Sequence, residues 1–413
     1  MSAVNKSGAG RQPAGLGDSG DSRDSNVRAD SCVAKSRAGS PCHEDLRERL
    51  LALGFDVVRF ARIAPAAQPV EALRAWLDAG RHADMDWIER GFEKRKNPGL
   101  VLSGAKSIVL LGVNYNPDAG AQGGALRWAR YARHADYHDT IKPALARAGR
   151  ALEEQLGITA DDYRCHVDTG PVLERAWAER AGAGFIGKNA MLISRDYGNW
   201  LFLAAIFVRA EIPSDEFAAP ATGRFRLCGR CARCMEACPT SALVGAGAVD
   251  SRLCIAYQTI ENKGIIPREL RAKIGARIYG CDVCAEVCPW NRFARESRGA
   301  LLDARPELAR LSLRDVLTLT PEKFATVFHK TAVKRIKLHG LLRNACVVAG
   351  NVVGGRECLE ELIALAGHAA PLVRMHAVWA VFRIAGRERA AELLREARAA
   401  ETDADVLREY EYV

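Results

Sequence analysis

The chain has 413 residues, of which 48% are hydrophobic and 26% charged, and its formal net charge is +9. A chain of this length can form two or three domains with buried cores. No apolar run approaches the roughly 18 residues that span a bilayer, and we see no export signal, so we expect a cytoplasmic protein without membrane association. Thirteen cysteines in that compartment indicate metal binding or catalysis rather than disulfides. The positive charge favours partners such as RNA or acidic proteins.

The first 42 residues are rich in Gly, Ser, Asp, Ala and Arg and hold almost no aromatic residue. They cannot bury enough apolar surface to offset the entropy of ordering, so residues 1–42 are predicted to be a disordered tail. We expect no role for Cys32 and Cys42, which lie within it.

Residues 43–221 show the alternation of strand and helix patterns that is typical of an α/β domain. A helical pattern begins at His43 and stops near Gly54. Apolar runs predict buried strands, and amphipathic segments predict helices between them. The expected strands are 57–60, 107–113 and 201–208, and the expected helices are 70–79, 140–156 and 172–182.

Eight cysteines between residues 222 and 300 carry the strongest signal. The first group reads Cys228-x2-Cys231-x2-Cys234-x3-Cys238-Pro239, which is the run of bacterial two-cluster ferredoxins. The second group, Cys281-x2-Cys284-x3-Cys288-Pro289, lacks the first position of that run, and Cys254 is the natural substitute. Zinc knuckles do not call for this spacing. We therefore predict a ferredoxin-like domain with two [4Fe–4S] clusters at 222–300.

In two-cluster ferredoxins the fourth cysteine of each run binds the other cluster. That rule assigns the first cluster to Cys228, Cys231, Cys234 and Cys288, and the second to Cys238, Cys254, Cys281 and Cys284. Cys165, Cys346 and Cys358 fall outside the pattern and are expected to be ordinary buried thiols.

Strand patterns end near residue 300, and residues 301–413 are predicted to be helical. The segment 341–348 is echoed by 372–379, and each copy opens a predicted helix pair. Stacked pairs with this period predict a HEAT-like unit. Two copies are few, so unrelated amphipathic helices remain an alternative.

Two features of the α/β region suggest chemistry. Asp168 follows a short strand and precedes a helix, where it could be an N-cap or a buried, protonated acid that donates a proton. The glycine-rich turn 182–189 suits close approach to a bulky ligand.

A relay of two clusters needs a final electron acceptor. In the α/β region no GxGxxG motif follows a predicted strand, where it would indicate a flavin or nicotinamide, and a corrinoid would suit this role. Because the segment from Asp136 to Ile141 lacks the glycine of the DxHxxG motif, we do not interpret His138 as a cobalt ligand.

The chain resembles the epoxyqueuosine reductase family over about residues 44–390. The resemblance lies in segments 128–131, 136–138, 168–171 and 187–189, followed by both cysteine groups in order. It implies an oxidoreductase that converts epoxyqueuosine to queuosine at the wobble position of tRNA anticodons. It also implies cobalamin as the reactive centre, two [4Fe–4S] clusters as the electron relay, and an external donor of flavodoxin or ferredoxin type. We expect a monomer.

The resemblance further implies roles for individual residues. Asp168 matches the proton donor of the family. The residues implied to line cobalamin, several through backbone atoms, are Tyr131, Asp168, Lys188, Asn189, Leu192, Ser194, Gln258, Thr259 and Asp282. The helical C-terminal region matches the part of the family that grips tRNA.

A run of positive charge in the C-terminal region agrees with an RNA partner. Seven Lys or Arg residues lie between Glu322 and Arg356, and Lys334, Arg335 and Lys337 are the proposed tRNA contacts. The alternative is a solvated helix face. Two other functions stay open: a corrinoid-dependent reductive dehalogenase-like enzyme acting on a small substrate, and a non-catalytic electron carrier or RNA-binding scaffold.

Overall fold

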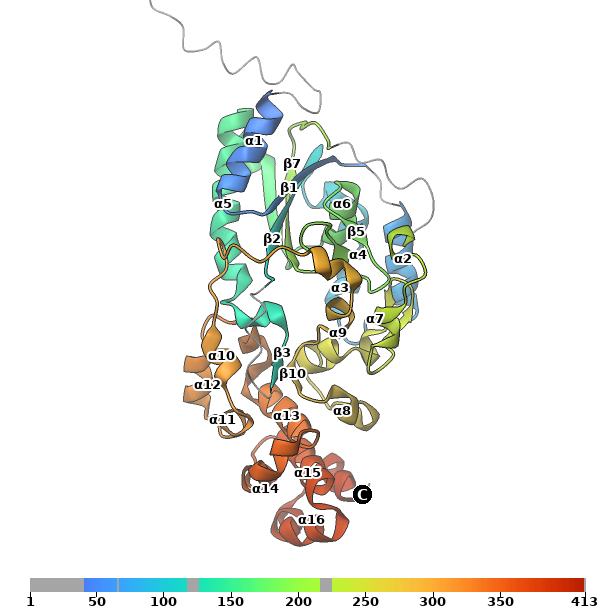
Figure 1. Cartoon of the computed structure of the whole chain (residues 1–413), viewed down its shortest axis with the longest axis vertical. Coiled ribbons are helices and arrows are strands. Elements are labelled where there is room, and N and C mark those ends of the chain that lie inside the picture. Colours follow the sequence, from blue (N-terminus) through green and yellow to red (C-terminus); the bar gives the residue numbers. More distant parts are fainter. Residues whose placement is uncertain (1–40, 65–66, 117–125, 216–224, 412–413) are drawn as a thin grey trace, which may run out of the picture.

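The computed structural model describes residues 41–64, 67–116, 126–215 and 225–411. The predicted tail therefore lies outside the described residues, apart from its last two positions. The molecule is elongated (Figure 1). A sheet with its helices forms one end, the C-terminal helices form the other, and the short helices of the cysteine region lie between them.

A four-stranded sheet with the order β1-β2-β7-β4 organises the first part of the chain. The strands are β1 (Val57–Arg62), β2 (Ser107–Asn114), β4 (Tyr163–Val167) and β7 (Leu201–Val208). Every neighbouring pair is antiparallel: Phe60 faces Val109 between β1 and β2, and Val109 faces Ile206 between β2 and β7. The predicted strands are thus present, and their order places β7 between β2 and β4.

Helices cover both faces of the sheet. Val109 and Leu111 of β2 pack on one face with α1 (Pro41–Ala52) and α5 (Tyr137–Leu156), whereas Ile108 and Leu110 pack on the other face with α6 (Glu174–Arg180). Successive side chains of a strand point to opposite faces, so a strand covered on both sides is apolar throughout. This explains why β2 is a continuous apolar run. The remaining helices of this part are α2 (Ala67–Asp78), α3 (Asp86–Arg90) and α4 (Phe92–Lys96).

The cysteine region consists of short elements joined by tight turns. Its helices are α7 (Arg233–Glu236), α8 (Arg268–Ile274) and α9 (Val283–Glu286), with the 3₁₀ helices η4 (Arg226–Cys228), η5 (Ser251–Leu253) and η7 (Pro289–Phe293) and the π-helix η6 (Tyr257–Glu261). Its strands are β8 (Leu243–Gly245), β9 (Ala248–Val249) and β10 (Arg277–Tyr279). β10 pairs in parallel with β3 (Arg127–Trp128), while β5 (Phe185–Ile186) pairs with β6 (Leu192–Ile193).

The C-terminal region is helical, as predicted. The first helix of each predicted pair is long: α13 (Lys337–Ala349) and α15 (Pro371–Ala385) pack against each other. The echoed segments 341–348 and 372–379 lie within these two helices. The other helices are α10 (Pro306–Arg310), α11 (Leu313–Leu317), α12 (Pro321–Val327), α14 (Leu359–Leu365), α16 (Arg387–Leu393), α17 (Arg395–Ala400) and α18 (Ala404–Glu411).

Arg343, one of the seven basic residues in the predicted surface run, is not on the surface. It is 1% exposed, and its guanidinium donates hydrogen bonds to the carbonyls of Gln258, Asn262 and Gly264 at 2.7–2.9 Å. These bonds satisfy a buried cation and carbonyls left free around the π-helix. The inclusion of Arg343 in an RNA-binding surface was therefore wrong; it holds the C-terminal helices to the cysteine region.

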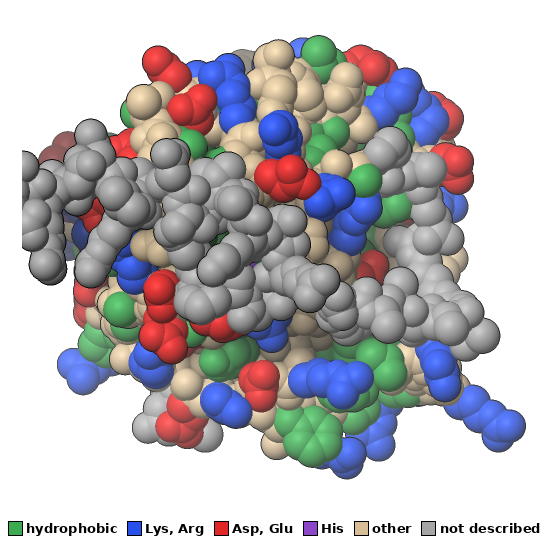
Figure 2. Space-filling model, turned by 90° about the horizontal axis from the view of Figure 1, so that it is seen from above, with side chains coloured by type: hydrophobic (Ala, Val, Ile, Leu, Met, Phe, Trp, Pro, Cys, Tyr) green, Lys and Arg blue, Asp and Glu red, His purple; other side chains and the backbone are tan. Residues whose placement is uncertain are grey.

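No helix within the described ranges is long and apolar enough to cross a membrane. Seen from the sheet end, Lys and Arg side chains are interspersed with Asp and Glu (Figure 2). The net positive charge of the chain is therefore not gathered on this face.

Candidate active site and cluster-binding cysteines

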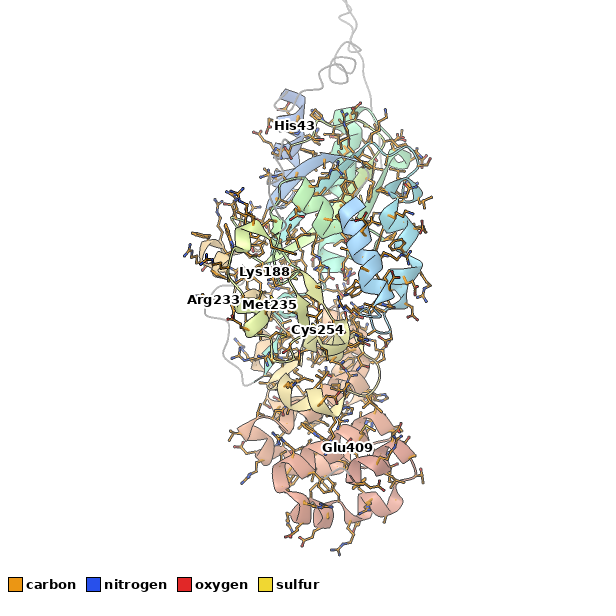
Figure 3. All side chains as sticks on the ribbon, turned by 90° about the vertical axis from the view of Figure 1, so that its right-hand side faces the viewer. His43, Lys188, Arg233, Met235, Cys254 and Glu409 are labelled. Atoms are coloured by element: carbon orange, nitrogen blue, oxygen red, sulfur yellow. The ribbon has the colours of Figure 1, made fainter. Side chains whose placement is uncertain are left out.

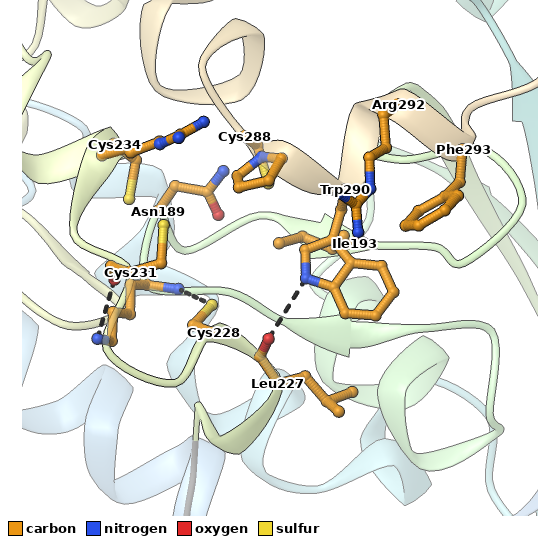
Figure 4. Close-up of a pocket in the computed structure, with 13 residues that line it drawn as sticks. Asn189, Ile193, Leu227, Cys228, Cys231, Cys234, Cys288, Trp290, Arg292 and Phe293 are labelled. Carbon is orange, nitrogen blue, oxygen red and sulfur yellow. Dashed lines mark hydrogen bonds between the residues drawn. The ribbon is translucent and has the colours of Figure 1, made fainter.

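Three thiols that are close in the sequence and a fourth that is distant line one cavity of about 440 Å³ (Figure 4). Cys228, Cys231 and Cys234 reach it from η4 and α7, and Cys288 reaches it from the residue before η7. The backbone N–H of Lys188 donates to the Cys228 sulfur at 3.4 Å. These are the four cysteines that the ferredoxin sharing rule assigns to the first cluster, and we call them the outer cysteines.

The other four predicted ligands, Cys238, Cys254, Cys281 and Cys284, form a second group, the inner cysteines. Burial raises the pKa of the Cys284 thiol, and its neighbours Cys254, Cys281 and Cys238 raise it further. Burial likewise raises the pKa of Cys281 to about 11. Because α7 and α9 pack together, each of the two cysteine runs contributes to both groups. The structure thus brings together the two sets that the sequence pattern proposes.

Three further cysteines lie elsewhere. Cys346 and Cys358 are buried in the helical region, and Cys165 is half-buried in β4. Burial raises the pKa of all three thiols, to about 11 for Cys165. This environment is the one expected for structural thiols.

Lys188 and Asn189 contact the cysteine loops directly. The Lys188 ammonium donates to the carbonyls of Gly229 and Cys231 at 2.8 and 3.0 Å. The buried Asn189 side chain donates to Asn199 and to the Cys284 carbonyl at 2.9 and 3.3 Å. The glycine-rich turn before them packs tightly, since a Cβ on Gly184 would lie 2.4 Å from the Ile193 carbonyl oxygen. Both side chains therefore join the two cysteine groups to the α/β part.

Asp168 is held in a network of hydrogen-bonding side chains just after β4. The Tyr137 hydroxyl donates to Asp168 Oδ2 at 2.6 Å, and His138 Nε2 lies 3.4 Å from the same oxygen. On the far side of the imidazole, His138 Nδ1 lies 2.7 Å from Asp136 Oδ1. Asp168 itself has φ of +57°, a conformation that costs a non-glycine residue about 1 kcal/mol or more and that is concentrated at functional sites.

The N-cap alternative for Asp168 is wrong. Helix α6 begins at Glu174, and the residue at its N-cap position is Leu173. The carboxylate of Asp168 instead accepts the Tyr137 hydroxyl. Its role is therefore not to cap a helix.

The charge state of Asp168 also differs from the expected one. The neighbouring His138 imidazole lowers the pKa of Asp168 most, burial acts in the opposite direction, and the hydrogen bond from the Tyr137 hydroxyl lowers it again. Burial disfavours charge on His138, but Asp136 and Asp168 outweigh that effect and raise its pKa to about 9. At neutral pH the pair is an imidazolium beside a carboxylate. The expectation of a protonated acid in an apolar cavity was therefore wrong; the Asp168 side chain is 56% exposed.

The C-terminal region reaches this network through Arg335, in the 3₁₀ helix η8 (Ala332–Ile336). Its guanidinium lies 3.0 Å from Glu261 of the π-helix. The charge of Arg335 also lowers the pKa of Asp168, after the larger effects of His138, burial and Tyr137. Lys334 and Lys337, the other predicted RNA contacts, are exposed beside it.

Of the other predicted cofactor contacts, Tyr131 lies beside the Asp168 network, and the rest are buried or bonded to other residues. The Tyr131 ring lies edge-on to Tyr137, with their centroids 6.2 Å apart, so Tyr131 borders the Asp168 network. Asp282 accepts the Arg130 N–H at 2.6 Å, and burial raises its pKa to about 6. The remaining four, Leu192, Ser194, Gln258 and Thr259, are buried; Gln258 and Thr259 make internal hydrogen bonds.

Sequence reasoning missed the acid–base partners of Asp168. Asp136 and His138 lie about thirty positions before Asp168, and only the fold brings them together. Their spacing offered one signal, because an acidic residue two positions before a histidine at a helix start can cap the helix and orient the ring. Asp136 does both: its carboxylate also accepts the His138 backbone N–H at 3.0 Å.

Comparison with known proteins identifies the family to which this chain is similar. A model described as "Epoxyqueuosine reductase QueG, DUF1730" matches residues 95–169, and a 4Fe–4S double cluster binding domain matches residues 227–291. The epoxyqueuosine reductase of Cellulophaga algicola is 36% identical over 303 residues, which cover 73% of this chain and 96% of that protein.

Two solved structures resemble the chain over nearly its whole length. An epoxyqueuosine reductase with an epoxyqueuosine-modified tRNA-Tyr stem loop has a TM-score of 0.77 and 30% identity, over 89% of this chain and 96% of that one. A Bacillus subtilis epoxyqueuosine reductase with its catalytic aspartate loop swung out of the active site has a TM-score of 0.76 and 29% identity, with the same coverage. By sequence and by structure, this chain belongs to the epoxyqueuosine reductase family.

Proposed function

We propose that this protein reduces epoxyqueuosine to queuosine at the wobble position of tRNA anticodons. Two electrons and two protons convert the epoxide to an alkene and water. The observation that carries the proposal is the Asp168–His138–Asp136 network, because removing an epoxide oxygen as water requires protons delivered to that oxygen. Nucleoside analysis of tRNA from a strain lacking the gene tests it.

The thiols suit the expected clusters. Four of them surround a cavity of about 440 Å³, and four more form the inner group. We propose Cys228, Cys231, Cys234 and Cys288 as ligands of one [4Fe–4S] cluster, and Cys238, Cys254, Cys281 and Cys284 as ligands of the other. The domain that binds both spans residues 222–300 in this proposal, between a catalytic domain at 43–221 and an RNA-binding domain at 301–413.

The surroundings of Asp168 also fit cobalamin, whose corrin ring carries many amide groups. Two buried polar atoms near it, His166 Nε2 and Glu174 Oε1, have no hydrogen-bond partner among the described residues. Unpaired buried polar atoms are costly and are usually satisfied by a ligand or water. Burial raises the pKa of Glu174 to about 7, so its carboxyl can donate as well as accept.

We propose that Tyr131 and Asp168 offer side chains to this cofactor. The other contacts use mainly backbone atoms, because most of these side chains are buried or bonded elsewhere; they are Lys188, Asn189, Leu192, Ser194, Gln258, Thr259 and Asp282. Bound clusters would supply one-electron transfer, and bound cobalamin would supply a strongly reducing centre for the epoxide carbon.

The protein's own part in the reaction is to deliver a proton. Asp168 is the proposed donor to the epoxide oxygen. In the resting network it is a carboxylate, so its proton comes from His138, whose Nε2 lies 3.4 Å away. Tyr137 fixes the carboxylate through its 2.6 Å hydrogen bond, and Asp136 fixes the imidazole from the other side. General acid catalysis usually relies on a proton donor that is held in position and whose pKa lies near the working pH.

This role of His138 predicts a pH dependence. The pKa of His138 is about 9 in the folded protein, against an ordinary value of 6.5. At saturating tRNA, turnover should therefore fall as the pH rises through about 9. His138→Gln should be slower at neutral pH and should lack this alkaline fall. An unchanged alkaline fall in His138→Gln would contradict the assignment.

The same raised pKa makes a separate prediction about stability. Protonation of His138 stabilises the folded state fully below about pH 6.5, and that contribution is lost as the pH rises through about 9. The Tm difference between the wild type and His138→Gln should shrink over that interval. A merely structural role for the ring would leave this difference independent of pH.

The exposed lysines of the C-terminal region are the proposed contacts for tRNA phosphates, within the stacked, HEAT-like helix pairs. The double variant Lys334→Glu, Lys337→Glu should raise the KM for tRNA and flatten its dependence on salt, because each phosphate contact releases counterions. Reversal of Arg335 should have a larger effect, since it also breaks the pair with Glu261. Kinetics across a salt series checks both.

An anticodon stem loop should remain a substrate, because only the loop and nearby phosphates need be held, with the modified base turned out of its stack.

The control for the double lysine variant is Arg147→Glu, Arg150→Glu, which reverses two exposed charges on α5. If reversal at Lys334 and Lys337 changes KM no more than this control does, the tRNA binds on another face.

A further inference from the structure

The four outer cysteines are half-buried and line a single cavity. Their cavity adjoins a second, more open hollow of about 930 Å³. Arg233 and Arg292 line both hollows, together with Cys288 and Pro289. In Figure 3 Arg233 lies at the outer edge of the molecule, Met235 lies further in, and Cys254 of the inner group lies further in again. Because Cys288 lines the open hollow and none of the inner cysteines does, the outer group is the one that a second protein can approach.

Arg233 and Arg292 line this opening, and the exposed Arg226 and Arg230 flank Leu227, Cys228 and Cys231 of its lining in the sequence; we call these four exposed arginines the arginine patch. Among the described residues, no carboxylate forms an ion pair with any of the four. Two arginines in the same segment behave differently, because Arg295 pairs with Asp196 at 3.2 Å and Arg298 pairs with Asp56 at 2.8 Å. The patch therefore holds positive charge that the described fold does not neutralise.

The acidic residues nearby are few. Glu236 and Glu286 line the open hollow, and Glu286 lies 3.9 Å from Arg130. The cavity of the outer cysteines has no acidic residue in its lining, which includes Lys188, Arg233 and Arg292. Among the residues that line the two hollows, Lys188, Arg233 and Arg292 outnumber Glu236 and Glu286, whereas the sheet end of the molecule mixes both signs (Figure 2).

An aromatic residue lies beside the patch. Phe293 is 51% exposed, and the Arg292 guanidinium lies 4.5 Å from its ring centre. Trp290 lines the cavity next to it and is fixed by its indole N–H, which donates to the Leu227 carbonyl at 3.4 Å (Figure 4). Exposed aromatic residues with arginines around them are the side chains that protein interfaces favour.

We propose that the arginine patch and Phe293 form the docking surface for an acidic electron-carrier protein. The positive charge of the patch favours an acidic partner. Because the patch lies next to the outer cysteines, electron transfer to their cluster is the function expected of the contact. Phe293 supplies the apolar centre, and the arginines steer the encounter. The inference rests on the proposed function, because it locates the external donor that this function requires.

The test measures binding and not only activity. An acidic flavodoxin is titrated onto the reconstituted full-length protein over a series of salt concentrations. The double variant Arg226→Glu, Arg230→Glu should weaken its Kd about tenfold at low salt and flatten the salt dependence, mainly by slowing association. Phe293→Ala should weaken Kd with little change in salt dependence.

Three controls separate the outcomes. Arg147→Glu, Arg150→Glu carries the same change in net charge and should leave flavodoxin binding unchanged. Iron content shows whether the outer cysteines still hold their cluster in each variant. The third control is the Kd of an anticodon stem loop, which should be the same in the patch variant and the wild type.

Two results would overturn the proposal. One is an unchanged flavodoxin Kd in the patch variant; the other is a weakened stem-loop Kd with an unchanged flavodoxin Kd, which would make the patch an RNA contact. Failure of the proposed reaction would look different: wild-type protein driven by a chemical reductant would leave epoxyqueuosine unchanged, whatever flavodoxin binds.

Discussion

Replacing Asp168 by asparagine should reduce turnover about 100- to 10,000-fold, the range that a general acid contributes. The amide is nearly isosteric with the carboxyl group and can still accept the Tyr137 hydroxyl, so the fold and the binding of both kinds of cofactor should survive. It cannot pass a proton from His138 to the epoxide oxygen. Single-turnover kinetics with a chemical reductant measures the loss.

Asp139→Asn is the matched control for this variant. Asp139 is exposed on the first turn of α5, in the same part of the protein, and makes no hydrogen bond or ion pair with Asp168. It should keep wild-type turnover. Near-wild-type turnover in Asp168→Asn, with cofactor content intact, would show that Asp168 is not the proton donor.

Replacing Cys254 by serine should remove one of the two clusters. Two [4Fe–4S] clusters contain about eight irons per chain, and the variant should retain about four. The outer cysteines do not include Cys254, so their cluster should remain visible by electron paramagnetic resonance after reduction. Turnover driven by a protein donor should be lost, because the relay is interrupted.

Cys165→Ser is the control, since that thiol lies in β4 outside both groups. Its iron content should equal that of the wild type. Retention of both clusters in Cys254→Ser would mean that another residue is the fourth inner ligand. Loss of both clusters would mean that the two groups do not form independently.

The cysteine groups could be predicted because their evidence is local in the sequence. The spacing of Cys228, Cys231 and Cys234 fits a cluster without knowledge of the rest of the fold, and the sharing rule needs only the second run. Strands β2 and β7 could be predicted for a similar reason, since an unbroken apolar run bounded by polar residues already indicates a strand buried on both faces.

The strand order and the Asp168 network depend on contacts between distant residues. Nothing in the sequence of β7 shows that it pairs with both β2 and β4, or that every pair is antiparallel. The position of Asp168 suggested an acid, but its charge state depends on His138 and Tyr137, which a different helix brings to it. A desolvation argument from local sequence therefore gave the wrong direction for its pKa.

Arg343 shows a further limit of sequence reasoning. By composition it belongs with the exposed lysines around it, yet it fills a buried position where three backbone carbonyls need a donor. A count of charges along a segment does not reveal which of them face inward. The proposed tRNA surface is therefore smaller than the run of charges suggests and centres on Lys334, Arg335 and Lys337.

The central claim is tested most directly by nucleoside analysis of total tRNA from a strain that lacks this gene. We predict that queuosine disappears and epoxyqueuosine accumulates, that the wild-type gene restores queuosine, and that the Asp168→Asn gene does not. Queuosine at the wild-type level in the deletion strain, with no accumulated epoxyqueuosine, would contradict the account.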